Sequence, residues 1–249
     1  MTTAHEDGLL AQAPSDYING SFRPLDGAAV RSHNPARPEQ VLWSGSPRPA
    51  HVDEAIAAAR AAFPAWSALA WEERVAALRR WQAVTTKHVD RIATLITREM
   101  GKPLAEGTFE AKALAGKVDI TLGEHSLARV EPYDVEAGET RTGRCRYKPL
   151  GVLAVVGPFN FPAHLPNGHF VPALLLGNTI VFKPSEKTAA VGQLLAELMH
   201  EAELPPGVFN VVQGGAEVAA PLVEHEDIDG VLFTGSWGVG RRIVEANLD

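Results

Sequence analysis

The chain has 249 residues, 45% hydrophobic and 21% charged, and its 30 acidic residues against 23 lysines and arginines give a formal net charge of -7. The length suits one large domain or two modest ones, and the composition is that of an ordinary soluble globular protein. The acidic balance argues against nucleic acid or an anionic membrane as a partner, because both require clustered cations. No secretory pattern or stretch near the ~20 apolar residues of a membrane span occurs, so we expect a cytoplasmic protein.

Residues 1–128 are predicted to be mainly helical. The segment 17–20 (YING) is typical of a strand that enters a turn. Apolar side chains then recur at spacings of three and four, the period of one helix face. This pattern predicts helices at 52–66, 72–87, 89–100 and from 106 towards 127. Gly101 and Pro103 follow the third of these, as expected where a helix is capped and stopped.

Residues 129–150 are predicted to form a β-arm. A turn signal at 136–139 (EAGE) separates two extended segments, 130–133 and 144–147. Two strands alone rarely form a stable sheet, so we expect a third strand from elsewhere in the chain or from another subunit. Cys145, the single cysteine, lies in this arm without a paired histidine. We therefore expect neither an internal disulfide nor a catalytic role for it.

From residue 151 to 249 the pattern alternates between strands and helices. Four short apolar strands begin near Gly151, Thr179, Val208 and Gly230, and each precedes a helical stretch: 165–176, 189–202, 217–223 and 239–246. Uniformly apolar strands that alternate with helices indicate a parallel sheet covered on both faces. Right-handed crossovers then predict an α/β fold with a Rossmann-like, doubly wound sheet. We expect this sheet to be incomplete, because the sequence stops within the helix after the fourth strand.

The run from Gly157 to Pro162 (GPFNFP) is the first candidate for chemistry. Asn160 supplies a neutral amide donor in a turn bounded by Pro158 and Pro162. Such a group suits a hydrogen bond to an oxygen that becomes negative during a reaction. The alternative interpretation is a turn-forming asparagine without further function.

The tetrapeptide Lys183-Pro184-Ser185-Glu186 follows the second of the four strands. A lysine at the carboxyl end of a parallel strand points towards the crevice where ligands bind. Glu186 suits a ribose diol and would repel a 2′-phosphate, which favours NAD over NADP. A lysine–glutamate pair on the surface is the alternative.

A glycine-rich turn, 235–240 (GSWGVG), follows the fourth strand. Glycines here let backbone amides approach a phosphate at a helix N-terminus, although such turns are as often purely structural. His164 and His169 bracket the first crossover helix without acidic or cysteine companions. A structural or substrate-contact role is therefore favoured over a metal site, and no metal is expected.

Taken in order, these motifs resemble the NAD(P)-dependent aldehyde dehydrogenase superfamily over nearly the whole chain. The segments that carry the resemblance are 59–66, 99–104, 148–152, 157–162, 177–179, 183–186, 204–208 and 233–236. The segments 162–169 (PAHLPNGH), 212–215 and 227–230 are most similar to succinylglutamate-semialdehyde dehydrogenases of arginine catabolism.

The resemblance implies oxidation of an aldehyde to the carboxylic acid with NAD. It implies that Asn160 donates to the substrate oxyanion and that Lys183 and Glu186 hold the adenosine ribose. Gly235, Ser236 and Gly240 would cradle the pyrophosphate, and Ser185 and Gly215 would belong to the same coenzyme site.

In family members the nucleophilic cysteine and the general-base glutamate lie in segments that have no counterpart among these 249 residues. We therefore expect an N-terminal portion that is inactive alone. Its division would be 1–128 as the helical part of the coenzyme domain, 129–150 as an oligomerisation-type arm and 151–249 as the Rossmann-like part, without a catalytic domain. The alternatives are one half of a split enzyme and a non-catalytic module that binds NAD or a partner. A homo-oligomer or association with a second half would complete the arm.

Overall fold

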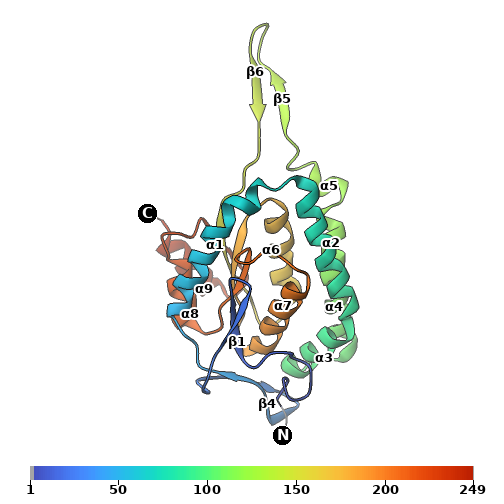
Figure 1. The fold of residues 1–249 in the computed structure, drawn as a ribbon, viewed down its shortest axis with the longest axis vertical. Helices are drawn as coiled ribbons and strands as arrows, with labels where there is room; N and C mark the ends of the chain where they lie inside the picture. Colours follow the sequence, from blue (N-terminus) through green and yellow to red (C-terminus); the bar gives the residue numbers. More distant parts are fainter. Residues whose placement is uncertain (1–2, 249) are drawn as a thin grey trace.

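A six-stranded sheet, in the order β10-β7-β8-β9-β1-β2, forms the centre of the structure (Figure 1). The structure, a computed structural model, describes residues 3–248. The strands of this sheet are β1 (Ser15–Ile18), β2 (Ser21–Pro24), β7 (Val152–Val156), β8 (Thr179–Lys183), β9 (Phe209–Val211) and β10 (Gly230–Phe233). The last four run parallel, whereas β1 pairs antiparallel with β9 and with β2. The predicted α/β fold with a Rossmann-like parallel sheet is confirmed.

Helices cover both faces of the sheet. On one side lie α1 (Ala50–Ala68), α8 (Ala216–Val223) and, beside α8, α9 (Trp237–Ala246). On the other side lie α6 (His164–Leu175) and α7 (Ala189–Glu201), backed by α2 (Trp71–Lys87), α3 (Val89–Met100) and α4 (Leu104–Thr121). Along β7, Val152 and Ala154 belong to the core cluster under α1 and α8, and Leu153 and Val155 belong to the cluster that contains Phe170 of α6. This alternation explains why the strand is apolar at every position.

The first 150 residues agree with the sequence predictions only in part. The predicted strand that enters a turn at 17–20 is confirmed: it is the end of β1 and the turn of a β1–β2 hairpin, and Tyr17 pairs with Val211 to join this hairpin to the main sheet. A second hairpin, β3 (Val30–Asn34) with β4 (Arg37–Gly45), was not predicted. The prediction of one helix from 106 towards 127 is wrong, because Gly123 adopts an extended conformation that separates α4 from a short α5 (Glu124–Leu127).

The β-arm is a hairpin of β5 (Tyr133–Glu136) and β6 (Thr142–Cys145), which projects away from the helices in Figure 1. Its strands lie nearer the turn than predicted, because Tyr133 pairs with Cys145 and the Ala137 amide closes the turn on the Arg141 carbonyl at 2.8 Å. Within residues 3–248, no third strand pairs with it. In the same range, no helix combines the length and apolarity that a membrane crossing requires.

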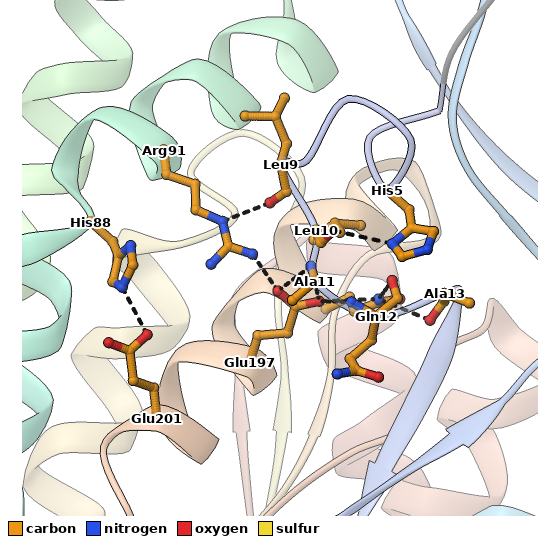
Figure 2. A network of polar contacts seen from close by, with 11 residues as sticks. His5, Leu9, Leu10, Ala11, Gln12, Ala13, His88, Arg91, Glu197 and Glu201 are labelled. Atoms are coloured by element: carbon orange, nitrogen blue, oxygen red, sulfur yellow. Dashed lines mark hydrogen bonds and ion pairs between the residues drawn. The ribbon is translucent and has the colours of Figure 1, made fainter.

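The N-terminal segment is attached to α7 through the side chain of Gln193, which donates to the Gln12 and Ala13 carbonyls, and through the carboxylate of Glu197 (Figure 2). Its oxygens accept hydrogen bonds from the amides of Ala11, at 2.9 and 3.0 Å, and Gln12, at 2.9 Å. Arg91 of α3 pairs with the same carboxylate and donates from Nε to the Leu9 carbonyl at 2.8 Å. Three segments distant in sequence are therefore joined at one buried charge.

Buried carboxylates from the outer helices also satisfy the first amides of α6 and α7. These amides need outside acceptors, because the first turn of a helix has no internal ones. Glu99 of α3 accepts from the Ala190 and Val191 amides at 2.9 and 2.8 Å. Glu110 of α4 accepts through Oε1 from the Ala163 and His164 amides at 3.0 and 3.1 Å.

Glu110 is fully buried, and its second oxygen lies 2.7 Å from the Lys102 ammonium. The ammonium also lies 3.7 Å from the centroid of the Phe161 ring, within cation–π range. The Lys102–Glu110 pair thus holds both the start of α6 and the residue after Asn160.

Replacing Glu110 by alanine is expected to destabilise the fold by about 3–5 kcal/mol, because the half-buried Lys102 charge and two helix amides lose their acceptor. Urea unfolding measures the difference. Glu106→Ala, an exposed position on the same helix, is the control and should stay within about 0.5 kcal/mol of the parent. Equal losses for the two variants would contradict the assignment.

Burial raises the pKa of Glu99 to about 7, although hydrogen bonds from the helix amides act in the opposite direction. Between the ordinary value of 4.5 and about 7, the folded state then binds more protons than the unfolded state, so stability falls as pH rises through this window. The contribution is at most about 3 kcal/mol. Unfolding curves at pH 5 and pH 8 should show this loss in the parent protein and not in Glu99→Gln, and identical pH dependence in both would refute it.

Candidate functional site

A cleft of about 660 Å³ lies at the carboxyl ends of β7, β8 and β10. Seven of the eight predicted site residues line it: Asn160, Lys183, Ser185, Glu186, Gly215, Gly235 and Ser236. They come from four loops, after β7, β8, β9 and β10, that are distant in sequence and adjacent in the parallel sheet. Gly240, the eighth, is not among the residues that line this cleft.

The Asn160 turn begins where the backbone passes very close to the neighbouring strand. A Cβ atom at Gly157 would lie 2.9 Å from the Phe182 ring and 3.0 Å from Pro166, so only glycine fits here. The Gly157 amide donates to the Lys183 carbonyl at 3.0 Å, which ties the turn to β8. Within residues 3–248 the exposed Asn160 side chain has no hydrogen-bond partner, so its amide is available to a ligand.

Lys183 is the last residue of β8, and its side chain is buried. Nζ donates to the carbonyls of Pro184, at 2.5 Å, and Gly214, at 2.9 Å. An ammonium group has three N–H donors, so one remains for a ligand in the cleft. Burial lowers the pKa of Lys183 to about 8, while the charges of Glu186 and Glu217 act in the opposite direction. The lysine is therefore mainly protonated at neutral pH.

Ser185, Glu186 and Gly215 complete the wall of the cleft near Lys183. The Ser185 hydroxyl accepts from the Lys187 amide at 3.3 Å and caps the short 3₁₀ helix η1 (Glu186–Thr188). The Glu186 carboxylate is half-buried and has no hydrogen-bond partner within residues 3–248. The Gly215 amide is already bound to Glu217 Oε1 at 2.8 Å, so a ligand would have to compete for it.

Ser236 marks the beginning of α9, and its hydroxyl accepts from the Val239 amide at 3.4 Å. The amides before Val239 have no acceptor within the helix and form a natural anion site. The ring of Phe233 gives a packing reason for glycine at both Gly235 and Gly240. A Cβ atom would lie 2.4 Å from this ring at Gly235 and 3.2 Å from it at Gly240.

Sequence motifs did not indicate several residues that support the cleft. Thr234 lines it and lies 3.1 Å from His169 Nε2, and Lys187 lies 4.7 Å from the centroid of the Phe159 ring. These pairs join residues that are far apart in the sequence or separated by a helix, so no local pattern could reveal them. The same holds for Glu110, which anchors the turn from α4.

The donor set of the cleft fits a dinucleotide. One free lysine N–H and an unpaired carboxylate lie in the same cleft and could serve a sugar diol as donor and acceptor, and the α9 amides suit phosphate. Within the described part of the chain, no group of three histidine, cysteine or acidic side chains could hold a metal ion.

The profile of the aldehyde dehydrogenase family matches residues 22–248. N-succinylglutamate 5-semialdehyde dehydrogenase 2 of Caulobacter vibrioides is 46% identical over 230 residues, which are 90% of this chain and 46% of that protein. The chain therefore spans about half the length of the curated relatives it matches.

Solved structures agree with the sequence match. An NADP-dependent enzyme of Escherichia coli gives a TM-score of 0.87 at 34% identity, over 96% of this chain and 50% of that one. An aldehyde dehydrogenase mutant from Pseudomonas syringae, in complex with NAD⁺ and octanal, gives 0.84 at 33% identity, over 96% and 48%. With a profile match over most of its length and a cleft whose walls come from the same motifs, the chain belongs to the aldehyde dehydrogenase family.

Proposed function

We propose that this chain binds NAD and positions an aldehyde for oxidation to the acid, with N-succinylglutamate 5-semialdehyde as the substrate. The observation that carries the proposal is the convergence of Asn160, Lys183, Glu186 and Ser236 on one cleft. The curated relatives named above support the substrate class.

Each residue has a defined task in this proposal. Lys183 donates its remaining N–H to a hydroxyl of the adenosine ribose, and Glu186 accepts from the same sugar. The first amides of α9 bind the pyrophosphate. The Asn160 amide donates to the aldehyde oxygen and stabilises the negative charge that grows on it during the reaction. Bound NAD⁺ supplies the acceptor for the hydride of the aldehyde carbon.

The nucleophile of the reaction is not assigned to Cys145. That residue lies on β6 in the projecting hairpin, and it is not among the residues that line the cleft. We assign two roles to this chain: it binds the coenzyme, and its Asn160 amide is the oxyanion donor. The exposed hairpin, with Tyr133 and Val135 on its surface, is the region where we expect another chain to pair.

Lys183→Met is expected to weaken NAD binding at least tenfold, about 1.4 kcal/mol, because the ribose loses its charged donor. Titration calorimetry with the 249-residue chain measures this effect. Because the pKa of Lys183 is about 8, the parent affinity should fall as pH rises from 7 to 9.5, and the variant should lose this dependence. Lys112→Met, an exposed lysine on α4, is the control. A flat titration of the parent protein at pH 7 would reject the proposal.

Glu186→Gln is expected to narrow the preference for NAD over NADP by about tenfold, because a neutral amide no longer repels a 2′-phosphate. The ratio of the two dissociation constants, measured for the parent and the variant, tests this role. An unchanged ratio would remove Glu186 from coenzyme selection without affecting the assignment of Lys183.

A further inference from the structure

A second group of polar side chains lies between α4 and α6, close to the Asn160 turn. On α4, Glu110, Leu114 and Lys117 are spaced to share one helix face. Glu110 binds the first amides of α6, and the Leu114 carbonyl accepts from Asn167 of α6 at 3.1 Å. Lys117 continues this row and lies against Gly168. A Cβ atom at Gly168 would be 3.8 Å from its Cε and 4.0 Å from its Nζ.

Lys117 is half-buried and has no hydrogen-bond or ion-pair partner within residues 3–248. Two neighbouring cations are paired, Lys102 just before α4 with Glu110 and Arg79 of α2 with Asp119, whereas Lys112 of α4 is exposed to water. A cation that is partly removed from water loses solvation, and an anion normally compensates for this loss. Lys117 therefore differs from the exposed Lys112 because it is partly removed from water and has no anion among the described residues to compensate.

Two histidines of α6 lie near enough to Lys117 to be affected by its charge, and each is also related to the cleft or its turn. Burial, followed by the charge of Lys117, lowers the pKa of His164 and of His169, so both rings are mainly neutral at pH 7. His169 contacts Thr234, which lines the cleft, and the His164 ring lies 6.5 Å from the ring of Phe161, the residue after Asn160. His164 Nδ1 is buried without a hydrogen-bond partner in the described chain. Both the His164 ring and the Lys117 ammonium therefore have a polar group without a hydrogen-bond partner in the described chain.

We propose that Lys117, assisted by His164, binds a carboxylate of the aldehyde substrate while Asn160 contacts its carbonyl oxygen. This inference rests on the proposed function and adds the substrate class to it: aldehydes that carry a carboxylate away from the reacting carbon. N-succinylglutamate 5-semialdehyde has this chemistry, because its succinyl part ends in a carboxylate and its glutamate part carries the α-carboxylate. An unbranched alkyl aldehyde would leave Lys117 unpaired.

The test uses the 249-residue chain and N-succinylglutamate, the acid product, which keeps both carboxylates of the substrate and carries a third in place of the aldehyde. Proton NMR follows the ring signals of His164 and His169 during titration. We expect saturable shifts in the parent protein, at least tenfold weaker binding in Lys117→Met, and binding close to the parent in Lys117→Arg, which keeps the charge. Lys112→Met, on the same helix, should bind as the parent does, and succinamide, which has no charge, should produce no shift.

Calorimetry with NAD on the same samples separates this inference from the proposed function. Equal NAD binding by the parent and by Lys117→Met, together with unchanged binding of N-succinylglutamate, would overturn the Lys117 assignment alone. Ring signals that do not respond to N-succinylglutamate in a parent protein that binds NAD would overturn it as well. Failure of the parent to bind NAD would instead overturn the proposed function.

Discussion

The candidate site depends on one buried carboxylate, that of Glu110. It is anchored by the Lys102 ammonium and binds the first amides of α6, so it fixes where that helix begins. The Asn160 turn lies between this fixed point and the end of β7. The close contact of Gly157 with Phe182 restrains the other side of the turn. The donor of the proposed oxyanion site is thus held from two directions, by Glu110 and by Phe182, and neither of these residues lines the cleft.

The same arrangement recurs where other helices meet. Glu99 binds the first amides of α7, and Glu197 joins the N-terminal segment to α3 and α7. In each case a long acidic side chain crosses between layers and receives directional bonds from backbone amides. Apolar contacts alone allow layers to slide, whereas charged hydrogen bonds select one relative position. The cleft is formed by loops that follow different strands, so its shape is kept better when the layers hold one relative position.

The parallel strands and most helices could be predicted from the sequence because each repeats a strong local pattern. The β7, β8 and β10 segments are short and apolar, and the helices after them have clear periodicity. The hairpin β3–β4 was missed because most of its side chains are polar and its apolar ones, such as Leu42 and Trp43, form no long alternation. The addition of β1 to β9 depends on a pairing across almost the whole chain. Such long-range pairing leaves no local signal.

The candidate site also contains residues that local patterns predict and residues that they do not. Residues at or just after the end of a strand, such as Lys183 and Ser236, could be placed because parallel strands end at one edge of a sheet. Gly240 was assigned to phosphate binding from its motif, and its neighbourhood to Phe233 shows a packing role that the motif did not indicate. Glu110 and Lys117 have no motif at all. Their positions matter only because α4 lies along α6.

The projecting hairpin opens at a lower free-energy cost than the sheet and its helices. Its strands bond only to each other in the described chain, and their side chains are mostly exposed. Opening it therefore exposes little new apolar surface, so its amides can exchange with solvent while the sheet and its helices stay closed. Far-ultraviolet and fluorescence measurements of unfolding, which follow helices and the buried tryptophans of the body, would register none of this motion.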